Sequence, residues 1–218
     1  MLRIKRKQRE RDNRINDIID AAEQLFFSKG YEKTTMDDIV KKAEFSKSTL
    51  YSYFESKEEI FLLVHMKGLE KRRLIISAMK KQKTGIDKLR VFGQEYYKFY
   101  KKYPEYLRLQ LNWSTNGINL DKINHSTFKR FKQLNESCVS EIRKSFQMEL
   151  QNSKHPSAGD IDRLVSYFLQ TLRTVLNQSL FPVDPLGRFN DHEYYLRYLD
   201  LFLLSVKAIS SNDHLEHD

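Results

Sequence analysis

The sequence contains little glycine or proline, with seven and four residues of each among 218. Both residues interrupt helices, so their scarcity favours long helical segments. The single cysteine, Cys138, excludes an internal disulfide and fits a reducing, cytoplasmic compartment. No run of about 18 uncharged apolar residues is present, so we expect no membrane span. The N-terminal residues also lack the apolar core of a secretory signal.

Motifs for catalysis and metal binding are missing from the sequence as well. The six histidines form neither H-E-x-x-H nor another metal-ligand spacing, and there is no glycine-rich phosphate loop. No pair of carboxylates stands out as a general acid and base. We therefore expect a protein that is not an enzyme and that needs no metal or other cofactor.

Positive charge is concentrated at the N-terminus. Residues 1–14 contain seven Lys or Arg and two acidic residues, whereas residues 15–57 contain six basic and eight acidic residues. Two interpretations of this basic arm stay open at this point. It is either a solvated, disordered tail or a segment that steers the chain towards a polyanion.

Helical periodicity runs through nearly the whole chain, and no segment is a convincing strand. Apolar residues from Ile15 to Phe26 predict a first helix, which Gly30 follows as a C-terminal cap. A short second helix is predicted after Thr35, whose side chain is expected to form a capping box with Asp38.

The third helix is expected to be about two turns long, to begin after Ser46 and to run through Phe54. Ser56 and Glu59 then form an S-x-x-E capping box that opens a fourth helix. Because no strong break follows, we expect this helix to be continuous over residues 57–82, on the order of 39 Å.

The remaining sequence predicts more helices and no other element. Further helices are expected over residues 86–102, 104–113, 122–150, 160–181 and 191–210, with loops at 112–121 and 151–160. The predicted fold class is therefore all-α, with two domains. Residues 1–56 would form the basic arm and a small helical domain, and residues 57–218 a larger helical bundle.

Only three residues, Glu44, Phe45 and Ser46, separate the second and third helices, which is typical of a helix-turn-helix. That motif lays its second helix in the major groove and presents its N-terminal residues to the bases. Small polar side chains lead the third helix, while Leu50 and Phe54 would anchor it inward. Tyrosine hydroxyls and a lysine at the start of the next helix would bond phosphates. The residues expected to contact DNA are Thr35, Ser46, Lys47, Ser48, Thr49, Tyr51, Ser52, Tyr53 and Lys57.

Residues 15–65 resemble the N-terminal signature of the TetR family of bacterial transcriptional regulators. The matching residues are Gly30-Tyr31, Thr34-Thr35, Ile39-Val40, Ala43, Phe45-Ser46, Leu50-Tyr51, Tyr53-Phe54 and Lys57-Glu58. The resemblance implies a dimeric repressor whose N-terminal domain binds operator DNA and whose C-terminal domain binds a small-molecule inducer. By position, Thr35 would cap the second helix near the DNA backbone and Ser46 to Thr49 would lead into the groove. Tyr51, Tyr53 and Lys57 would contact phosphates.

Three positions depart from the family pattern. Glu44 stands where the family usually has glycine in the turn, so a positive φ there would cost about 1 kcal/mol. Ser48 replaces a common glycine and Tyr53 a common histidine. These substitutions leave the expected fold unchanged and bear on how the bases are read.

The last two predicted helices, 160–181 and 191–210, are apolar on more than one face. A helix that is apolar nearly all round is buried on both sides, so we expect these helices to form a homodimer interface. Two copies would then present their third helices to successive major grooves of a palindromic operator.

Aromatic residues with a few polar neighbours also predict a site for a small apolar or aromatic effector in the C-terminal region. Its expected lining residues are Tyr96, Tyr100, Trp113, Phe131, Tyr167, Gln170 and Thr174. Ordinary core packing is the alternative for each of these aromatic residues. For the whole chain, the alternative function is a helical scaffolding or interaction protein of the same fold without a ligand response.

Overall fold

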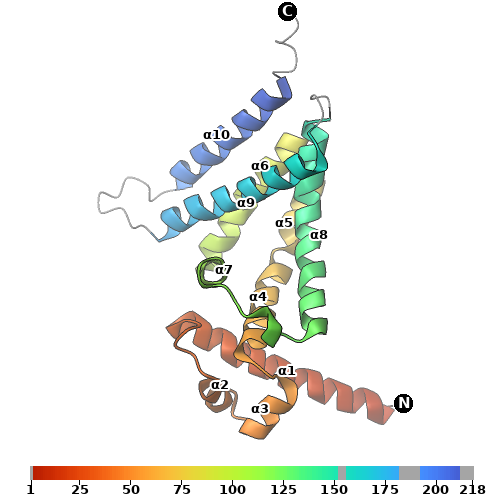
Figure 1. The fold of residues 1–218 in the computed structure, drawn as a ribbon, viewed down its shortest axis with the longest axis vertical. Helices are drawn as coiled ribbons and strands as arrows, with labels where there is room; N and C mark the ends of the chain where they lie inside the picture. Colours follow the sequence, from red (N-terminus) through yellow and green to blue (C-terminus); the bar gives the residue numbers. More distant parts are fainter. Residues whose placement is uncertain (1, 152–155, 182–191, 212–218) are drawn as a thin grey trace, which may run out of the picture. The chain divides into compact units, whose positions relative to one another are not determined.

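The structure is a computed structural model that describes residues 2–151, 156–181 and 192–211 (Figure 1). Helices make up most of this part, and no strand occurs within it, which confirms the all-α class. In chain order the elements are α1 (Leu2–Lys29), α2 (Met36–Ala43), α3 (Lys47–Tyr53), α4 (Lys57–Lys71), α5 (Arg73–Lys80), α6 (Gly85–Lys102), α7 (Pro104–Asn116), the 3-10 turn η1 (Leu120–Lys122), α8 (His125–Glu149), α9 (Ala158–Leu180) and α10 (His192–Ser211).

The chain divides into two compact units. The first, called here the N-terminal unit, comprises residues 1–70 and 108–134. The second, the C-terminal unit, comprises residues 71–107 and 135–218. The domain boundary predicted between residues 56 and 57 stays a prediction.

The N-terminal unit has a core formed by the first four helices. α1 packs on α2, and α2 packs on α3. Phe61 of α4 joins them, because its ring centroid lies 5.8 Å from that of Phe26 and 4.6 Å from that of Tyr31. A second cluster in the same unit centres on Leu62, Met66 and Ile123, which are all buried. α3 is therefore joined to this unit through α2.

The predicted starts of α2 and α3 are found where the sequence places them. Thr35 caps α2 in a full capping box with Asp38, and the side chain of Ser46 caps α3. The box at Ser56 is only half formed. Ser56 Oγ accepts a hydrogen bond of 3.1 Å from the Glu59 backbone, but the Glu59 carboxylate accepts one of 2.8 Å from Thr127 Oγ1.

The predicted continuous helix over residues 57–82 is wrong, because the chain turns at Arg72 between α4 and α5. The Ile75 amide donates to the Arg72 carbonyl at 2.9 Å, which is the i to i+3 bond of a tighter turn. The Arg72 guanidinium lies 5.6 Å from the ring centroids of both Tyr96 and Tyr100. We attribute the break to this inward placement of Arg72, since neither glycine nor proline stands at the turn.

Two other helix boundaries differ from the sequence prediction. α1 begins at Leu2 rather than near Ile15, so the basic arm is helical and not a disordered tail. α7 continues through residues 112–116, which were predicted as loop. It ends at Gly117, whose φ of +70° allows its amide to donate to the Trp113 carbonyl at 3.0 Å.

The C-terminal unit is built around α6, which packs against α5, α9 and α10. Close approach of α6 and α10 depends on Gly93, since a Cβ there would lie 2.6 Å from a methyl carbon of Leu199. The Tyr195 hydroxyl donates to the Gly93 carbonyl at 2.9 Å in the same contact. Tyr195 and Leu199 are completely buried, so α10 contributes one face to this core.

Candidate DNA-binding site

The turn between α2 and α3 has the left-handed backbone that a tight helix-turn-helix needs. Glu44 has φ of 58° and ψ of 33°, and its amide donates to carbonyls in the last turn of α2. It is the non-glycine residue with positive φ in the described part of the chain. The structure therefore confirms that an L-residue stands here in a conformation that favours glycine.

The leading end of α3 is polar, exposed and capped. Ser46 Oγ accepts a hydrogen bond of 3.1 Å from the Thr49 amide and lies 2.9 Å from Ser48 Oγ. Lys47 Nζ donates to Asp37 Oδ2 at 2.7 Å, and this hydrogen bond raises the pKa of Lys47. Lys47 therefore stays charged at the end of the helix that the sequence assigns to the groove.

The other side of α3 anchors it in the N-terminal unit. Leu50 is fully buried and Phe54 is 4% exposed. Tyr51 points outward with 51% of its surface exposed, Ser52 is also exposed, and Tyr53 is half-buried. This division fixes the orientation of α3 and leaves one face available to a partner.

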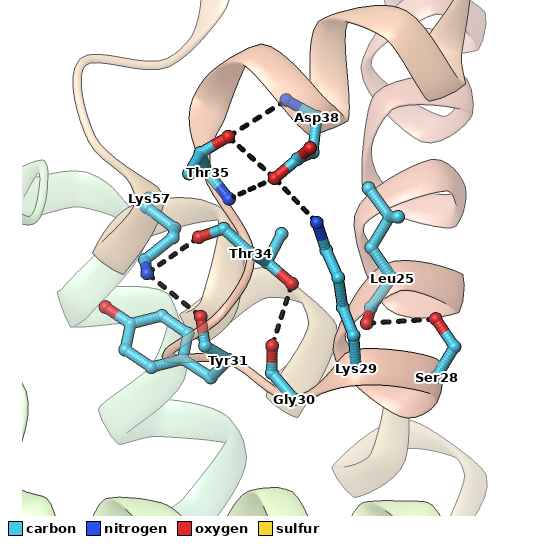
Figure 2. Close-up of polar contacts among 9 residues, drawn as sticks. All are labelled: Leu25, Ser28, Lys29, Gly30, Tyr31, Thr34, Thr35, Asp38 and Lys57. Atoms are coloured by element: carbon cyan, nitrogen blue, oxygen red, sulfur yellow. Dashed lines mark hydrogen bonds and ion pairs between the residues drawn. The ribbon is translucent and has the colours of Figure 1, made fainter.

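Lys57 is tied to the segment that precedes α2 (Figure 2). Its ammonium group donates hydrogen bonds of 2.9 Å to the carbonyls of Tyr31 and Thr34, and it lies 4.1 Å from the centroid of the Tyr31 ring. Burial lowers the pKa of Lys57, although Glu32 and Glu58 act in the opposite direction. Burial likewise raises the pKa of the Tyr31 phenol. The structure thus gives Lys57 a structural task that sequence reasoning missed.

Asp38 is the centre of a second polar cluster in Figure 2. One carboxylate oxygen accepts from the Thr35 amide at 2.8 Å and from Thr35 Oγ1 at 2.6 Å, and it also lies 2.7 Å from Lys29 Nζ. These bonds, with that from Lys29 the largest, hold the pKa of the Asp38 carboxyl well below its usual range. Lys29 was not predicted, and its nine-residue separation from Asp38 follows no helical period.

The seven residues predicted to bind an effector fall in three places. Tyr96 and Tyr100 are buried in the C-terminal unit, with ring centroids 4.8 Å apart. Trp113 and Phe131 stack in the N-terminal unit at 5.0 Å. The other three, Tyr167, Gln170 and Thr174, lie on the exposed side of α9. Sequence reasoning did not identify Arg72 beside Tyr96 and Tyr100, because its contacts are distant along the chain.

Residues 18–64 match the family model described as bacterial regulatory proteins, tetR family. The biofilm operon icaADBC HTH-type negative transcriptional regulator IcaR of Staphylococcus aureus is 28% identical over 191 residues, which cover 85% of this chain and 97% of IcaR. Residues 18–64 therefore form a TetR-family N-terminal domain. The resemblance drawn from residues 15–65 is thereby confirmed.

Two solved structures share the fold over most of the chain. AibR, in complex with isovaleryl coenzyme A and operator DNA, superposes with a TM-score of 0.62 at 17% identity, covering 86% of this chain and 97% of AibR. FadR of Bacillus subtilis, in complex with stearoyl-CoA, superposes with a TM-score of 0.59 at 15% identity, covering 88% of this chain and 97% of FadR. At this identity they establish the fold alone.

This TetR-family chain is a transcriptional regulator and not an enzyme, in agreement with the sequence analysis. The family model begins at residue 18, within α1, so the basic first half of that helix lies outside the matched region. Within the described residues, no helix is long and apolar enough to cross a bilayer.

Proposed function

We propose that the chain is a homodimeric repressor that binds a palindromic operator through α3 of each copy and leaves it when a small effector binds. The observation that carries this proposal is that α3 has an exposed polar leading end and a buried apolar side. Its leading end exposes Lys47 and Ser48, while Leu50 on its other side is fully buried. A helix held in this way presents a fixed row of polar groups to the edges of bases.

The ion pair between Lys47 and Asp37 is compatible with DNA binding. Both side chains are more than half exposed, at 63% and 53%. Exposed pairs contribute about 0–1 kcal/mol, so exchanging Asp37 for a phosphate oxygen costs little. Tyr51 and Tyr53 would add hydroxyl contacts to the backbone, and Thr35 would lie near it at the start of α2. Ser46, Thr49, Ser52 and Lys57 keep the roles proposed from the sequence, with Lys57 acting chiefly through the fold.

The proposed dimer interface uses the outer faces of α9 and α10. On α10, Tyr198, Leu201, Leu204 and Ile209 are 38–64% exposed, although Tyr195, Leu199, Leu203 and Val206 of the same helix are buried. A helix that is apolar on both faces is expected to have both faces buried, here one against its own chain and the other against a partner subunit. A second copy packed here would form an isologous four-helix interface.

We propose that the effector carries an apolar or aromatic group that packs against Tyr96 and Tyr100. Arg72 lies beside both rings, so its guanidinium could form an ion pair with an anionic group of the effector. The acyl-CoA thioesters named for AibR and FadR combine these features, which makes them the first compounds to try. Trp113, Phe131, Tyr167, Gln170 and Thr174 remain sequence predictions for this role. Operator binding also requires access to the chromosome, so we infer a cytoplasmic location.

DNA binding is tested by selecting duplexes from a randomised library with the full-length chain and measuring the affinity of single variants for the selected duplex. Lys47→Ala and Tyr51→Phe should each weaken binding, Lys47→Ala by about five- to thirty-fold, the factor for 1–2 kcal/mol. A matched change at an exposed residue of the C-terminal unit, Lys80→Ala, should leave affinity unchanged. Equal affinity of all three variants would contradict the proposed site, and failure to select any duplex would favour the scaffolding alternative.

Effector binding is tested by thermal unfolding with isovaleryl-CoA, stearoyl-CoA and free coenzyme A. A true effector at about a hundredfold excess over its Kd should raise Tm by about 5–10 °C. Arg72→Gln should abolish that rise. Stabilisation by free coenzyme A to the same extent would show that the apolar group plays no part.

A further inference from the structure

The first half of α1 is a basic helix that lies outside the family match. The match begins at residue 18, while the helix begins at Leu2. Its acidic residues are engaged within the helix itself: Glu10 pairs with Arg6 at 3.0 Å, and Asp12 accepts from Gln8 at 2.9 Å. The basic residues therefore dominate the charge of this segment.

One stripe of α1 changes from apolar to basic along its length. Ile18 and Ala22 are fully buried and Leu25 is half-buried, and together they form the packing stripe of the helix. Spacings of three and four residues continue this stripe backwards to Arg14, Arg11 and Lys7, and residues at this spacing share a helix face. The face that packs on the core in the second half of α1 thus carries a row of cations in the first half.

That basic stripe borders a groove beside α3. The groove has a volume of about 550 Å³ and is lined by Lys7, Gln8, Glu10, Arg11, Arg14, Ser52 and Tyr53. Arg11 reaches from one side to the other, because its guanidinium carbon lies 5.5 Å from the centroid of the Tyr53 ring. The groove therefore joins three cations of α1 to the last turn of the helix that we assign to the major groove.

We propose that this groove binds the sugar-phosphate backbone of the DNA that flanks the bases read by α3. This inference rests on the proposed function. Lys7 and Arg14 are separated by roughly 10 Å along the helix axis, at 1.5 Å per residue. That length corresponds to about three nucleotides of one strand, at 3.4 Å each. Three cations on the α1 side of the groove and the Tyr53 hydroxyl on the α3 side thus fit a short run of phosphates.

Phosphate contacts have a measurable signature that base contacts lack. Each neutralised phosphate releases counterions and adds about 0.9 to the slope of log K against log salt. The contact carries no sequence information, because every nucleotide has the same phosphate. The groove should therefore raise affinity and salt dependence while leaving the choice of sequence to α3.

The chain offers a matched pair of double variants for the test. Lys7→Ala/Arg11→Ala removes two groove cations four residues apart. Lys5→Ala/Arg9→Ala also removes one lysine and one arginine with the same spacing, but about 200° around the helix, since each residue turns it by about 100°. Alanine is the best helix former, so both variants should keep α1 helical, as circular dichroism would verify.

Binding is measured by fluorescence anisotropy on the selected duplex with about one turn of extra DNA on each side, between about 50 and 200 mM salt. The groove variant should reduce the slope by about 1.8 per chain, and the control variant should keep the wild-type slope. The ratio of affinities for selected and scrambled duplexes should be the same for all three proteins. On a duplex trimmed to the selected bases, the wild type and the groove variant should bind alike.

The outcomes separate this inference from the function on which it rests. Equal slope changes in the two double variants would show that only total charge matters and would overturn the inference. If neither double variant changes the salt slope, the inference is also overturned. If the groove variant changes the ratio of affinities for selected and scrambled duplexes, the groove reads bases and not only phosphates. If the wild type binds selected and scrambled duplexes equally, the proposed function fails, whatever the variants do.

Discussion

The ammonium group of Lys57 lies 4.1 Å from the centroid of the Tyr31 ring and donates a 2.9 Å hydrogen bond to the Tyr31 carbonyl. A second bond of 2.9 Å reaches the Thr34 carbonyl (Figure 2). One side chain at the start of α4 therefore fixes the segment between α1 and α2. That segment holds α2, against which α3 packs, so the position of the proposed DNA-reading helix depends on this lysine.

Replacing Lys57 by methionine should destabilise the chain. Methionine keeps most of the apolar stem of the lysine side chain but leaves the carbonyls of Tyr31 and Thr34 without their charged donor. A hydrogen bond from a charged group contributes about 1.5–3 kcal/mol. We expect a loss of about 2 kcal/mol in the free energy of unfolding, measured by urea denaturation. Lys33→Met, at an exposed position nearby, is the control and should change stability by less than about 0.5 kcal/mol. Equal stability of both variants would show that the Lys57 contacts contribute nothing.

Glu44→Gly should stabilise the chain by about 1 kcal/mol, because φ is 58° at this position and glycine adopts that conformation without strain. Urea denaturation again provides the measurement. Glu44→Ala retains a Cβ and should give almost no gain, which separates backbone strain from the loss of the carboxylate. A similar gain from both substitutions would point to charge rather than conformation.

The capping box of α2 should weaken in acid. The folded-state pKa of Asp38 is depressed, so its contribution to stability is complete above the unfolded pKa of about 3.9 and is lost as pH falls below it. Comparing urea midpoints at neutral pH and near pH 3, wild type should lose more stability than Asp38→Asn, which has no carboxylate to protonate. Equal losses of stability in the two proteins would show that protonation of Asp38 does not contribute to destabilisation in acid.

Leu204→Glu should break the proposed dimer. Leu204 is 60% exposed on the outer face of α10, and a carboxylate buried there by a second copy would be unpaired. Light scattering should give twice the 26.1 kDa chain mass for wild type and the single mass for this variant. Leu74→Glu is the control, because Leu74 is 79% exposed on α5, and it should remain dimeric. A monomeric wild type would exclude the interface.

Features that depend on neighbouring residues could be predicted from the sequence. Thr35 with Asp38 and Ser46 with Thr49 are each three residues apart, and a helix start is decided within that distance. Gly30 also has the positive φ of +85° expected of a helix end. The same local rules predicted the helix-turn-helix and its buried anchors.

Features set by distant contacts could not be predicted. The helix is interrupted at Arg72, whose guanidinium lies beside Tyr96 and Tyr100 far along the chain, and neither glycine nor proline stands at that position. One carboxylate oxygen of Glu59 accepts a hydrogen bond from Thr127, 68 residues away, instead of closing the capping box with Ser56. For the candidate site, exposure of Tyr51 and burial of Leu50 followed from helical spacing, but the carbonyl contacts of Lys57 did not.

A competition assay shows whether α3 reads a DNA sequence. The full-length chain is bound to its selected duplex at physiological salt, and scrambled duplex of the same length is added as competitor. If α3 reads sequence, the selected duplex should be preferred by about a thousandfold or more, the lower limit typical of specific regulators. Equal competition by the scrambled duplex would contradict it, because attraction to phosphates alone does not distinguish sequences.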